Sequence, residues 1–275
     1  MTLPITYDAR RGMRREILSL VQEHKQRHPK VGALGLIDAP VPTGPVLADY
    51  IVDPLGHHPL THIPNPKIFW SNMGNNNIGD CDFASLATIT NASDIGLGKR
   101  PSVSQRECTR AYWAYCRKYN GGKDVGAWPL QVLMDWMNAP LFGSKLVAYA
   151  NAPESDIETL KSYIFHFGGV STSVTLYDST VAQFRSGAPW VPTVPLTSDK
   201  MYGGHQISLI GYDESYFYAE TWGRIVKIAP EWLALLNYGG YVTWHFVFIT
   251  PAVAIAKAFR HVNLPALIGD LEKAI

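Results

Sequence analysis

In the middle of this chain, apolar side chains recur every three to four residues, which is the spacing of one helix face. This pattern predicts helices over Cys81–Asn91, Ser104–Tyr119, the stretch WPLQVLMDWM and the stretch NAPESDIETLKSYIFHFGG. Beyond residue 169 the pattern changes to short runs of β-branched and aromatic residues, which are typical of strands. These runs are VSTSVTL, HQISLIGYD, YFYAETWG, RIVKIA and YVTWHFVFIT. The pattern therefore predicts an α+β protein with a helical lobe followed by an antiparallel β lobe.

The two ends of the chain differ from this middle part. Residues Arg10–His28 combine charged and apolar positions as an amphipathic helix does, and the prolines and glycines of residues 31–66 predict an extended arm along a surface. The tail returns to helical composition, interrupted by Pro265. We predict four segments: a helix and proline-rich arm (1–62), a helical lobe (63–150), a β-rich lobe (151–251) and a helical tail (252–275).

Composition excludes several classes of protein. With 47% hydrophobic and 17% charged residues, the 275-residue chain can bury a substantial core. Lys and Arg, 24 in all, balance 23 Asp and Glu, so no basic field draws the chain to nucleic acid or to a membrane surface. We see neither an apolar run that could span a bilayer nor a secretory signal. Three cysteines are too few for a disulfide framework and favour a reducing compartment such as the cytoplasm.

The stretch NNNIGDCDFASLATI places Cys81 in the first turn of a predicted helix. Unpaired backbone N–H groups and the helix dipole favour a thiolate there, so Cys81 is a candidate nucleophile. His205 follows Gly203 and Gly204 at the start of an apolar run and is a candidate base, and Glu220 on the next predicted strand is a candidate partner that orients it. A lone cysteine is more often buried packing, but three complementary roles together favour catalysis.

These segments resemble the papain-like cysteine peptidases, whose nucleophile begins the central helix of a helical lobe and whose histidine lies on a strand of a β lobe. SVSQRECTRAYWAYCRKYNGG looks like the family's second helix and glycine pair, GGVSTSVTLYDSTVAQFRSG like its strand-and-helix segment, and AETWG like its asparagine-serine-tryptophan-glycine motif. The resemblance covers about Ile63 to Pro251. It implies the papain-like two-lobe fold and a cysteine endopeptidase that needs no metal or organic cofactor.

The resemblance also implies roles for individual residues. The implied roles are oxyanion donors at Asn75 and Asn76, substrate-binding positions at Gly121, Gly122 and Gly204, and a ring at Trp222 that shields the histidine from water. Two positions depart from the family pattern. Glu220 stands where the family has asparagine, and its carboxylate would orient the histidine and raise its pKa. Asp82 stands where the family has an aromatic residue, and we expect it to point outward and cap backbone N–H groups.

The remaining histidines and cysteines have simpler interpretations. His57, His58 and His62 lack a surrounding pattern of ligand spacing, so we interpret them as loop residues and predict no metal site. His166 and His245 lie in apolar surroundings, as satisfied interior histidines do. Cys108 and Cys116 are predicted to be structural.

The leading hypothesis is a thiol protease that cleaves a peptide or protein substrate in the cleft between two lobes, through a thioester on Cys81. One alternative keeps the nucleophile but acts on cell-wall peptides. Another is a catalytically silent scaffold within a larger assembly such as a virus particle. The N-terminal arm is predicted to be a permanent structural element, through which the chain could form a homo-oligomer or join an assembly, and not a removable propeptide.

Overall fold

The computed structural model describes residues 45–51, 58–64, 70–152, 157–193, 199–233, 245–257 and 262–274. The predicted helix at Arg10–His28 and most of the predicted arm lie outside the described residues, as does His57. The elements are η2 (Leu47–Tyr50), α2 (Cys81–Gly96), α3 (Gln105–Tyr119), α4 (Pro129–Asn138), β1 (Ala148–Asn151), α5 (Ile157–Phe167), β2 (Val170–Tyr177), α6 (Asp178–Ser186), β3 (Met201–Tyr212), β4 (Phe217–Thr221), β5 (Arg224–Ile228), β6 (His245–Ile249), α8 (Pro251–Lys257) and α9 (Leu264–Ala274).

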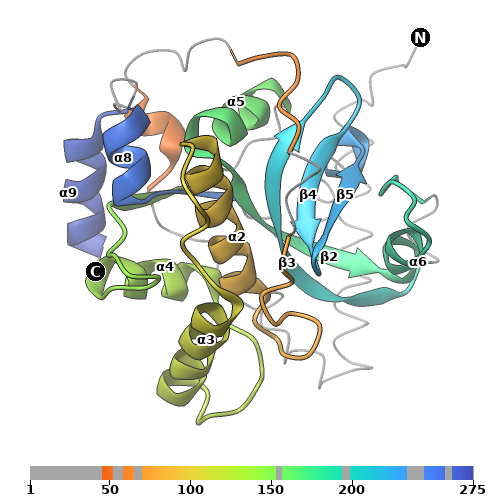
Figure 1. Ribbon diagram of the computed structural model, residues 1–275, viewed down its shortest axis with the longest axis horizontal. Coiled ribbons are helices and arrows are strands. Elements are labelled where there is room, and N and C mark those ends of the chain that lie inside the picture. The colour runs from red at the N-terminus through yellow and green to blue at the C-terminus, as the bar shows by residue number, and fades with distance from the viewer. Residues whose placement is uncertain are drawn as a thin grey trace, which may run out of the picture.

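Among the described residues, the strands form one antiparallel sheet in the order β1-β6-β2-β3-β4-β5 (Figure 1). The long pair β2 and β3 runs in register from Val170 opposite Leu209 to Leu176 opposite Gly203, and the register shifts before Tyr177, which lies opposite Met201. The pairs Ser171–Phe246 and Thr172–His245 join β2 to β6, which pairs with β1. The sheet therefore continues without interruption from β5 to β1. The predicted α+β class is confirmed.

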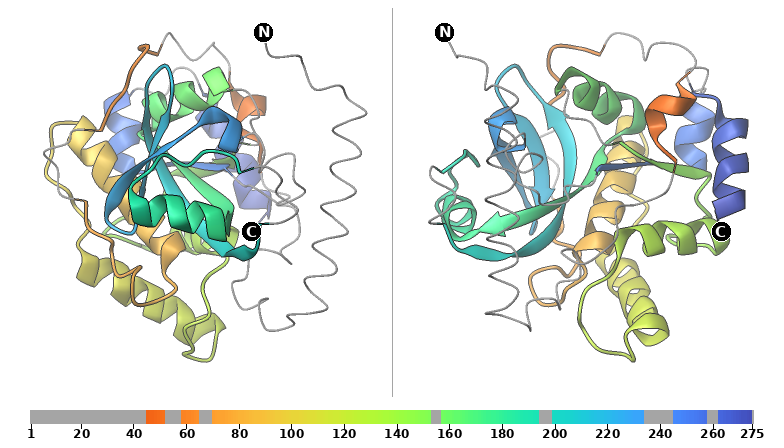
Figure 2. Two further views of the ribbon diagram at one scale, coloured as in Figure 1. Left: turned by 90° about the vertical axis from the view of Figure 1, so that its right-hand side faces the viewer. Right: turned by 180° about the vertical axis from the view of Figure 1, so that it is seen from behind.

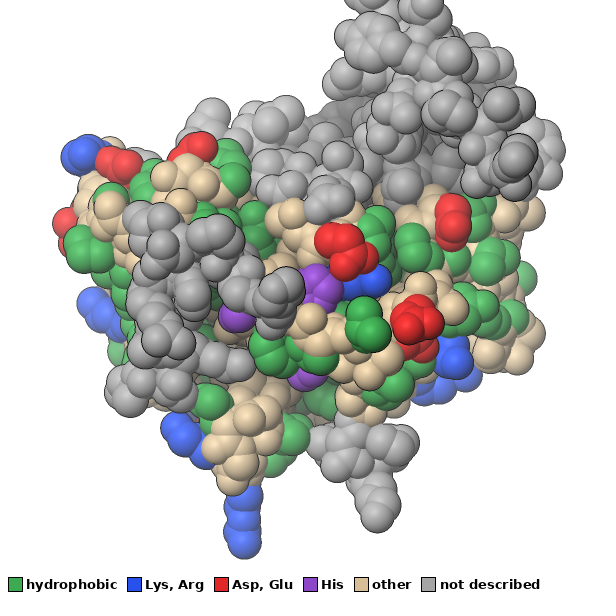
Figure 3. All heavy atoms as spheres, turned by 90° about the horizontal axis from the view of Figure 1, so that it is seen from above, with side chains coloured by type: hydrophobic (Ala, Val, Ile, Leu, Met, Phe, Trp, Pro, Cys, Tyr) green, Lys and Arg blue, Asp and Glu red, His purple; other side chains and the backbone are tan. Residues whose placement is uncertain are grey.

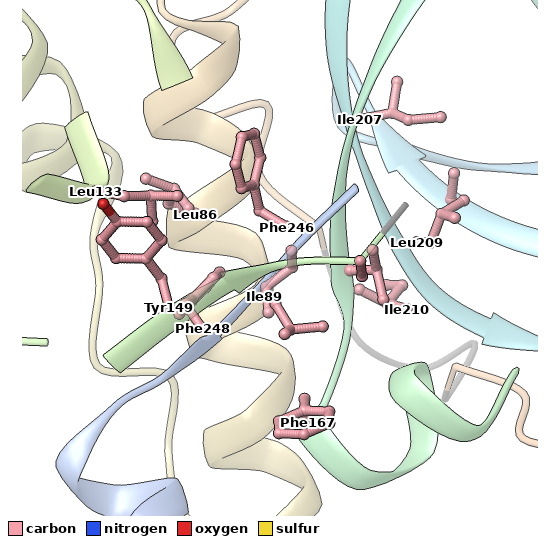
Figure 4. Packing of buried hydrophobic residues seen from close by; sticks show 14 of the residues in the cluster. Leu86, Ile89, Leu133, Tyr149, Phe167, Ile207, Leu209, Ile210, Phe246 and Phe248 are labelled. Carbon is pink, nitrogen blue, oxygen red and sulfur yellow. The ribbon is translucent and has the colours of Figure 1, made fainter. Parts of the chain in front are cut away.

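Helix α2 runs through the middle of the molecule, with the β3–β5 strands on one side and α3 and α4 on the other (Figure 1). Its side chains are buried on all faces, including Phe83, Leu86 and Ile89. Figure 4 shows Leu86 and Ile89 among side chains that come from the sheet and from α4. The helix also buries polar side chains, and the hydroxyls of Ser85 and Thr88 donate hydrogen bonds to β3 and β4. This central position fixes its first residue, Cys81, relative to the sheet.

The connection from α5 to β2 touches α2 directly. Gly168 and Gly169 form this turn with φ of 84° and 154°, values that favour glycine. A Cβ atom on Gly168 would lie 2.2 Å from the Ser93 hydroxyl oxygen, and one on Gly169 would lie 3.0 Å from an Ile89 side-chain carbon. The glycine pair that ends the predicted helix thus allows close packing against α2.

The predicted helices of the middle region are confirmed. Helix α3 begins with a capping box, in which the Ser104 hydroxyl accepts from the Glu107 N–H while the Glu107 carboxylate accepts from the Ser104 N–H. Helix α4 begins with Pro129, whose missing N–H costs nothing at a helix start. Strand β1 was not predicted, because four buried residues are too few to show a period.

The described N-terminal segment is tied to the C-terminal tail (Figure 2). The Tyr50 hydroxyl donates to the Asp270 carboxylate at 2.9 Å, the Tyr50 carbonyl accepts from the Asn263 N–H at 2.7 Å, and Leu47 is fully buried. The tail is helical with an interruption before Pro265, as predicted: α8 ends at Lys257 and α9 begins at Leu264, so that Pro265 is the second residue of α9, where proline is tolerated. None of the helices within the described ranges is long and apolar enough to cross a membrane.

Candidate active site

Cys81 is the first residue of α2 and is partly exposed. Its sulfur accepts hydrogen bonds from the backbone N–H groups of Asp82 and of Gln206, the residue that follows His205 on β3. The fold therefore brings the predicted nucleophile against the strand that carries the predicted base, although 124 residues separate the two in the sequence.

His205 is held by two neighbours from the end of β4. Its Nε2 lies 2.7 Å from the Thr221 hydroxyl oxygen, and its ring stacks on the ring of Trp222, with centroids 4.4 Å apart and planes inclined by 20°. Trp222 in turn meets Phe184 of α6 edge-on at 4.7 Å. The indole covers one face of the imidazole, the position that a shielding residue would need.

Glu220 does not make the hydrogen bond to His205 that we predicted. Its Oε2 accepts from the Thr88 hydroxyl at 3.1 Å, its Oε1 accepts from the Gly223 N–H at 2.8 Å, and only 4% of the residue is exposed. The physical reason is the alternation of side chains along β4, which directs Glu220 toward α2 and its neighbour Thr221 toward His205. Burial raises the pKa of Glu220 to about 7, against the two hydrogen bonds, which lower it.

A cleft of about 390 Å³ lies over Cys81 and His205. One wall comes from the loop before α2, with Asn75 to Gly79, and from Asp124 to Ala127. The other wall comes from the β side, with Leu176, Tyr202, Gly203, Gly204, His205 and Trp222. The cleft thus lies between the helical and β parts of the molecule and has room for an extended chain beside the thiol.

Gly121 and Gly122, which we expected beside the substrate, do not line this cleft. They reverse the chain at the end of α3 with φ of 60° and 79°, and a Cβ atom added at either would meet no other atom within 4 Å. The segment that reaches the cleft comes slightly later, because the Asp124 carboxylate accepts from the Gly79 N–H at 2.9 Å and from the Tyr112 hydroxyl. This tie places Gly126, with φ of 87°, in the wall where we expected the glycine pair.

The electrostatic surroundings favour neutral forms of both groups. Burial raises the pKa of the Cys81 thiol far above its usual range, and Asp82 adds to the rise, while the two backbone hydrogen bonds oppose it. Burial lowers the pKa of His205 to about 3. Near neutral pH these two shifts favour a thiol and a neutral imidazole over an ion pair.

Asp82 does not point outward as we expected. It is buried, with 3% of its surface exposed, and its Oδ1 has no hydrogen-bond partner among the residues that the structure describes. Burial raises its pKa well above the usual range, and the nearby Asp80 adds to this. Asp80, fully buried just before Cys81, has its pKa raised to about 7 by burial. Two acids that hold their protons into the neutral range thus flank the thiol.

The candidate oxyanion donors lie in the cleft wall. Asn75 is partly exposed, and its Nδ2 lies 3.4 Å from the Ile78 carbonyl oxygen, a long contact within the same loop. Asn76 is exposed and also lines the cleft. Their role as donors stays a prediction.

The other histidines lie away from this cleft. His58 pairs with Glu158 at 3.4 Å and meets the ring of Tyr212, and His62 contacts Tyr212 and Phe165. Figure 3 shows histidine side chains close together on the face seen from above. Within the described part of the chain, no group of three or more His, Cys, Asp or Glu could hold a metal ion.

His245 is an interior histidine, 2% exposed, as we predicted, but it is only half satisfied. Its Nδ1 lies 2.8 Å from the Thr172 hydroxyl oxygen, while its Nε2 has no hydrogen-bond partner among the described residues. His166 is only partly buried and meets Phe165 edge-on. Cys108 and Cys116 are fully buried free thiols, as a structural role requires.

Solved structures resemble this fold. One is xylellain, a cysteine protease from Xylella fastidiosa, with a TM-score of 0.54 and 16% sequence identity. The match covers 76% of this chain and 94% of the xylellain chain. Digestive procathepsin L2 proteinase from the larval midgut of Tenebrio molitor matches 90% of this chain and 96% of its own with a TM-score of 0.53 at 14% identity. No protein-family model and no curated protein matches the sequence. The chain has the papain-like α+β fold of two lobes that its motifs predicted.

Proposed function

We propose that the protein is a cysteine endopeptidase, with Cys81 as nucleophile and His205 as general base and acid. The observation that carries this proposal is that the first residue of α2 and a histidine of β3 line one cleft, with the sulfur held against the backbone next to that histidine. A thiol at a helix N-terminus, a base and a substrate-sized cleft are the parts that acyl transfer to cysteine requires.

The reaction would proceed through a thioester. As the Cys81 sulfur attacks the substrate carbonyl carbon, His205 takes the thiol proton on Nδ1, the ring nitrogen that Thr221 leaves available. The same proton then passes to the leaving amine as the C–N bond breaks. Water next attacks the thioester carbonyl carbon, and His205 takes a proton from that water. The C–S bond then breaks, which releases the carboxylic acid, and His205 returns the proton to the sulfur to restore the thiol.

The oxyanion would be stabilised by the backbone N–H of Cys81 and by an asparagine amide of the loop before α2. Asn75 is the stronger candidate, because its amide lies close to Cys81: it makes a long contact with the Ile78 carbonyl and hydrogen-bonds to Asp80, the residue before Cys81. The substrate would lie extended between Gly126 on one wall and Gly204 on the other, where the lack of side chains lets its backbone approach.

Hydrolysis of a fluorogenic peptide library by the full chain tests the proposal, together with labelling by an electrophilic epoxide probe. We expect Cys81→Ala and His205→Ala each to lose at least about 10³-fold in kcat, because members of one catalytic unit fail together. Cys108→Ala, which changes a buried thiol outside the cleft, is the control and should keep both activity and labelling. Comparable turnover by Cys81→Ala would overturn the proposal.

A catalytically silent scaffold is the second candidate, and one observation favours it. The raised pKa of the Cys81 thiol and the buried Asp80 and Asp82 beside it all oppose a thiolate. Such a protein would serve as a binding or structural component. A folded wild-type chain that neither reacts with the epoxide nor cleaves the peptide library or cell-wall peptides would support this candidate.

A further inference from the structure

We propose that Thr221 is the positioning residue for His205: its hydroxyl holds the plane of the imidazole and accepts a hydrogen bond from Nε2, which leaves Nδ1 unprotonated. This inference rests on the proposed function, in which His205 must present one unprotonated ring nitrogen to Cys81. The family motif in the sequence assigns this role to the preceding residue, Glu220, so the inference concerns which of two adjacent side chains acts on the ring.

Strand register decides between the two residues. Strands β3 and β4 pair with Ser208 opposite Glu220, and paired residues project from the same face of a sheet. Glu220 therefore shares a face with Ser208, while Thr221 shares the opposite face with His205. The greater length of the Glu220 side chain cannot bring its carboxylate to His205, because the side chain projects from the opposite face of the sheet.

The contacts agree with the register. Both carboxylate oxygens of Glu220 are engaged, by the Thr88 hydroxyl on α2 and by the Gly223 N–H. The second bond closes the turn in which Trp222 adopts φ of 50° and Gly223 φ of 76°. Glu220 therefore acts on the turn that presents Trp222, and Thr221 acts on the histidine itself.

Two contacts, one at the edge of the ring and one on its face, set the orientation of the His205 imidazole. The Thr221 hydroxyl meets its edge at Nε2, and the Trp222 indole covers its face. Thr221 is 3% exposed, so water does not compete for this hydrogen bond, and a β-branched side chain has few χ1 states to lose. When Nε2 carries the proton and donates it to the hydroxyl, Nδ1 is left as the base.

The chain supplies a matched control for this pair. Thr172 and His245 form a second buried threonine–histidine hydrogen bond, at 2.8 Å, outside the cleft. Replacing either threonine with valine keeps the shape and removes only the hydroxyl. The two variants should lose similar stability, so a difference in catalysis between them reports on position and not on folding.

We expect Thr221→Val to lower kcat by about 10²-fold, the low end of what general acid–base catalysis contributes, with little change in KM. Thr221→Ser should keep most of the activity because it keeps the hydroxyl, and Thr172→Val should keep the wild-type kcat. The inference is overturned if Thr221→Val turns over like the wild type, or if Thr221→Ser is as inactive as Thr221→Val.

A measurement without turnover separates this inference from the proposed function. Long-range ¹H–¹⁵N spectra of the wild-type chain should show His205 protonated on Nε2 and unprotonated on Nδ1, with His205→Gln used to assign the signal. The Nδ1–H tautomer in the wild type would overturn the inference even if Thr221→Val does not fold. A chain with the expected tautomer but no peptidase activity would instead refute only the proposed function.

Discussion

At the scale of single residues, the chemistry of Cys81 is set by what surrounds its sulfur. The first turn of a helix favours a thiolate, but burial and Asp82 outweigh that contribution and raise the thiol pKa. His205, with its pKa lowered to about 3, does not supply a compensating positive charge in the resting state. The nucleophile would then form by proton transfer during attack and not before it.

This predicts how Cys81 reacts with iodoacetamide. The rate should be low at neutral pH and should keep rising as pH increases beyond 9, because only the thiolate is alkylated and its pKa is raised. The rate is measured by mass spectrometry of the Cys81 peptide between pH 5 and 10, with free cysteine as the reference thiol. A fast rate that stays level between pH 5 and 8 would instead reveal a resting ion pair.

Cys81 and His205 could be proposed from the sequence because each lies in a motif with its own local signature, a helix start and a glycine-flanked strand. Thr221 could not be proposed from the sequence, because the choice between adjacent positions depends on how β4 is registered against β3. The alternation of the strand was readable, but which face of it meets the histidine was not.

At the scale of elements, the start of α2 combines the proposed nucleophile with a buried acid whose stability contribution depends on pH. Asp80 is buried with a pKa of about 7, beside Asp82 and with Asp124 near enough to raise its pKa further. The folded state therefore holds protons that the unfolded state releases above about pH 4. Stability due to Asp80 is present at acid pH and is lost as pH rises from about 4 to 7.

We therefore predict that the free energy of unfolding falls with pH across this window, by up to about 1.4 kcal/mol per pH unit for Asp80. Asp80→Asn should remove that part of the slope, as measured by urea denaturation at several pH values. Asp213→Asn is the control of opposite sign. Burial raises the pKa of Asp213, but hydrogen bonds with Tyr218, Ser215 and Tyr216 outweigh burial, so the pKa of Asp213 is lowered overall. A slope unchanged in Asp80→Asn would contradict the assignment.

At the scale of the whole molecule, residues 45–51 belong to the folded core. Leu47 is fully buried, and the backbone bonds from Asn151 to Pro45 and from Asn263 to Tyr50 tie the segment to β1 and to the tail. Part of the predicted arm thus has a structural role. The sequence did not show this, because a single leucine between prolines carries no period.

Leu47→Ala should lower the free energy of unfolding by about 2–5 kcal/mol, the usual cost of a cavity at a buried leucine. Leu60→Ala, at a position that is 75% exposed, should change it by less than about 0.5 kcal/mol. Both are measured by urea denaturation.

Deleting residues 1–60 removes Leu47 and Tyr50 together and should destabilise the chain without raising its activity. A truncated chain that stays folded and cleaves peptides much faster would show that the arm is a propeptide.

The unbroken ladder from β5 to β1 has a mechanical consequence. Two lobes joined by a flexible linker could move apart by a hinge motion. Here β2 is hydrogen-bonded both to β3, which carries His205, and to β6, which pairs with β1. A hinge motion between β3 and β6 would have to break backbone hydrogen bonds in the interior of the sheet. The wall of the cleft that carries His205 therefore keeps a fixed position relative to β6 and β1.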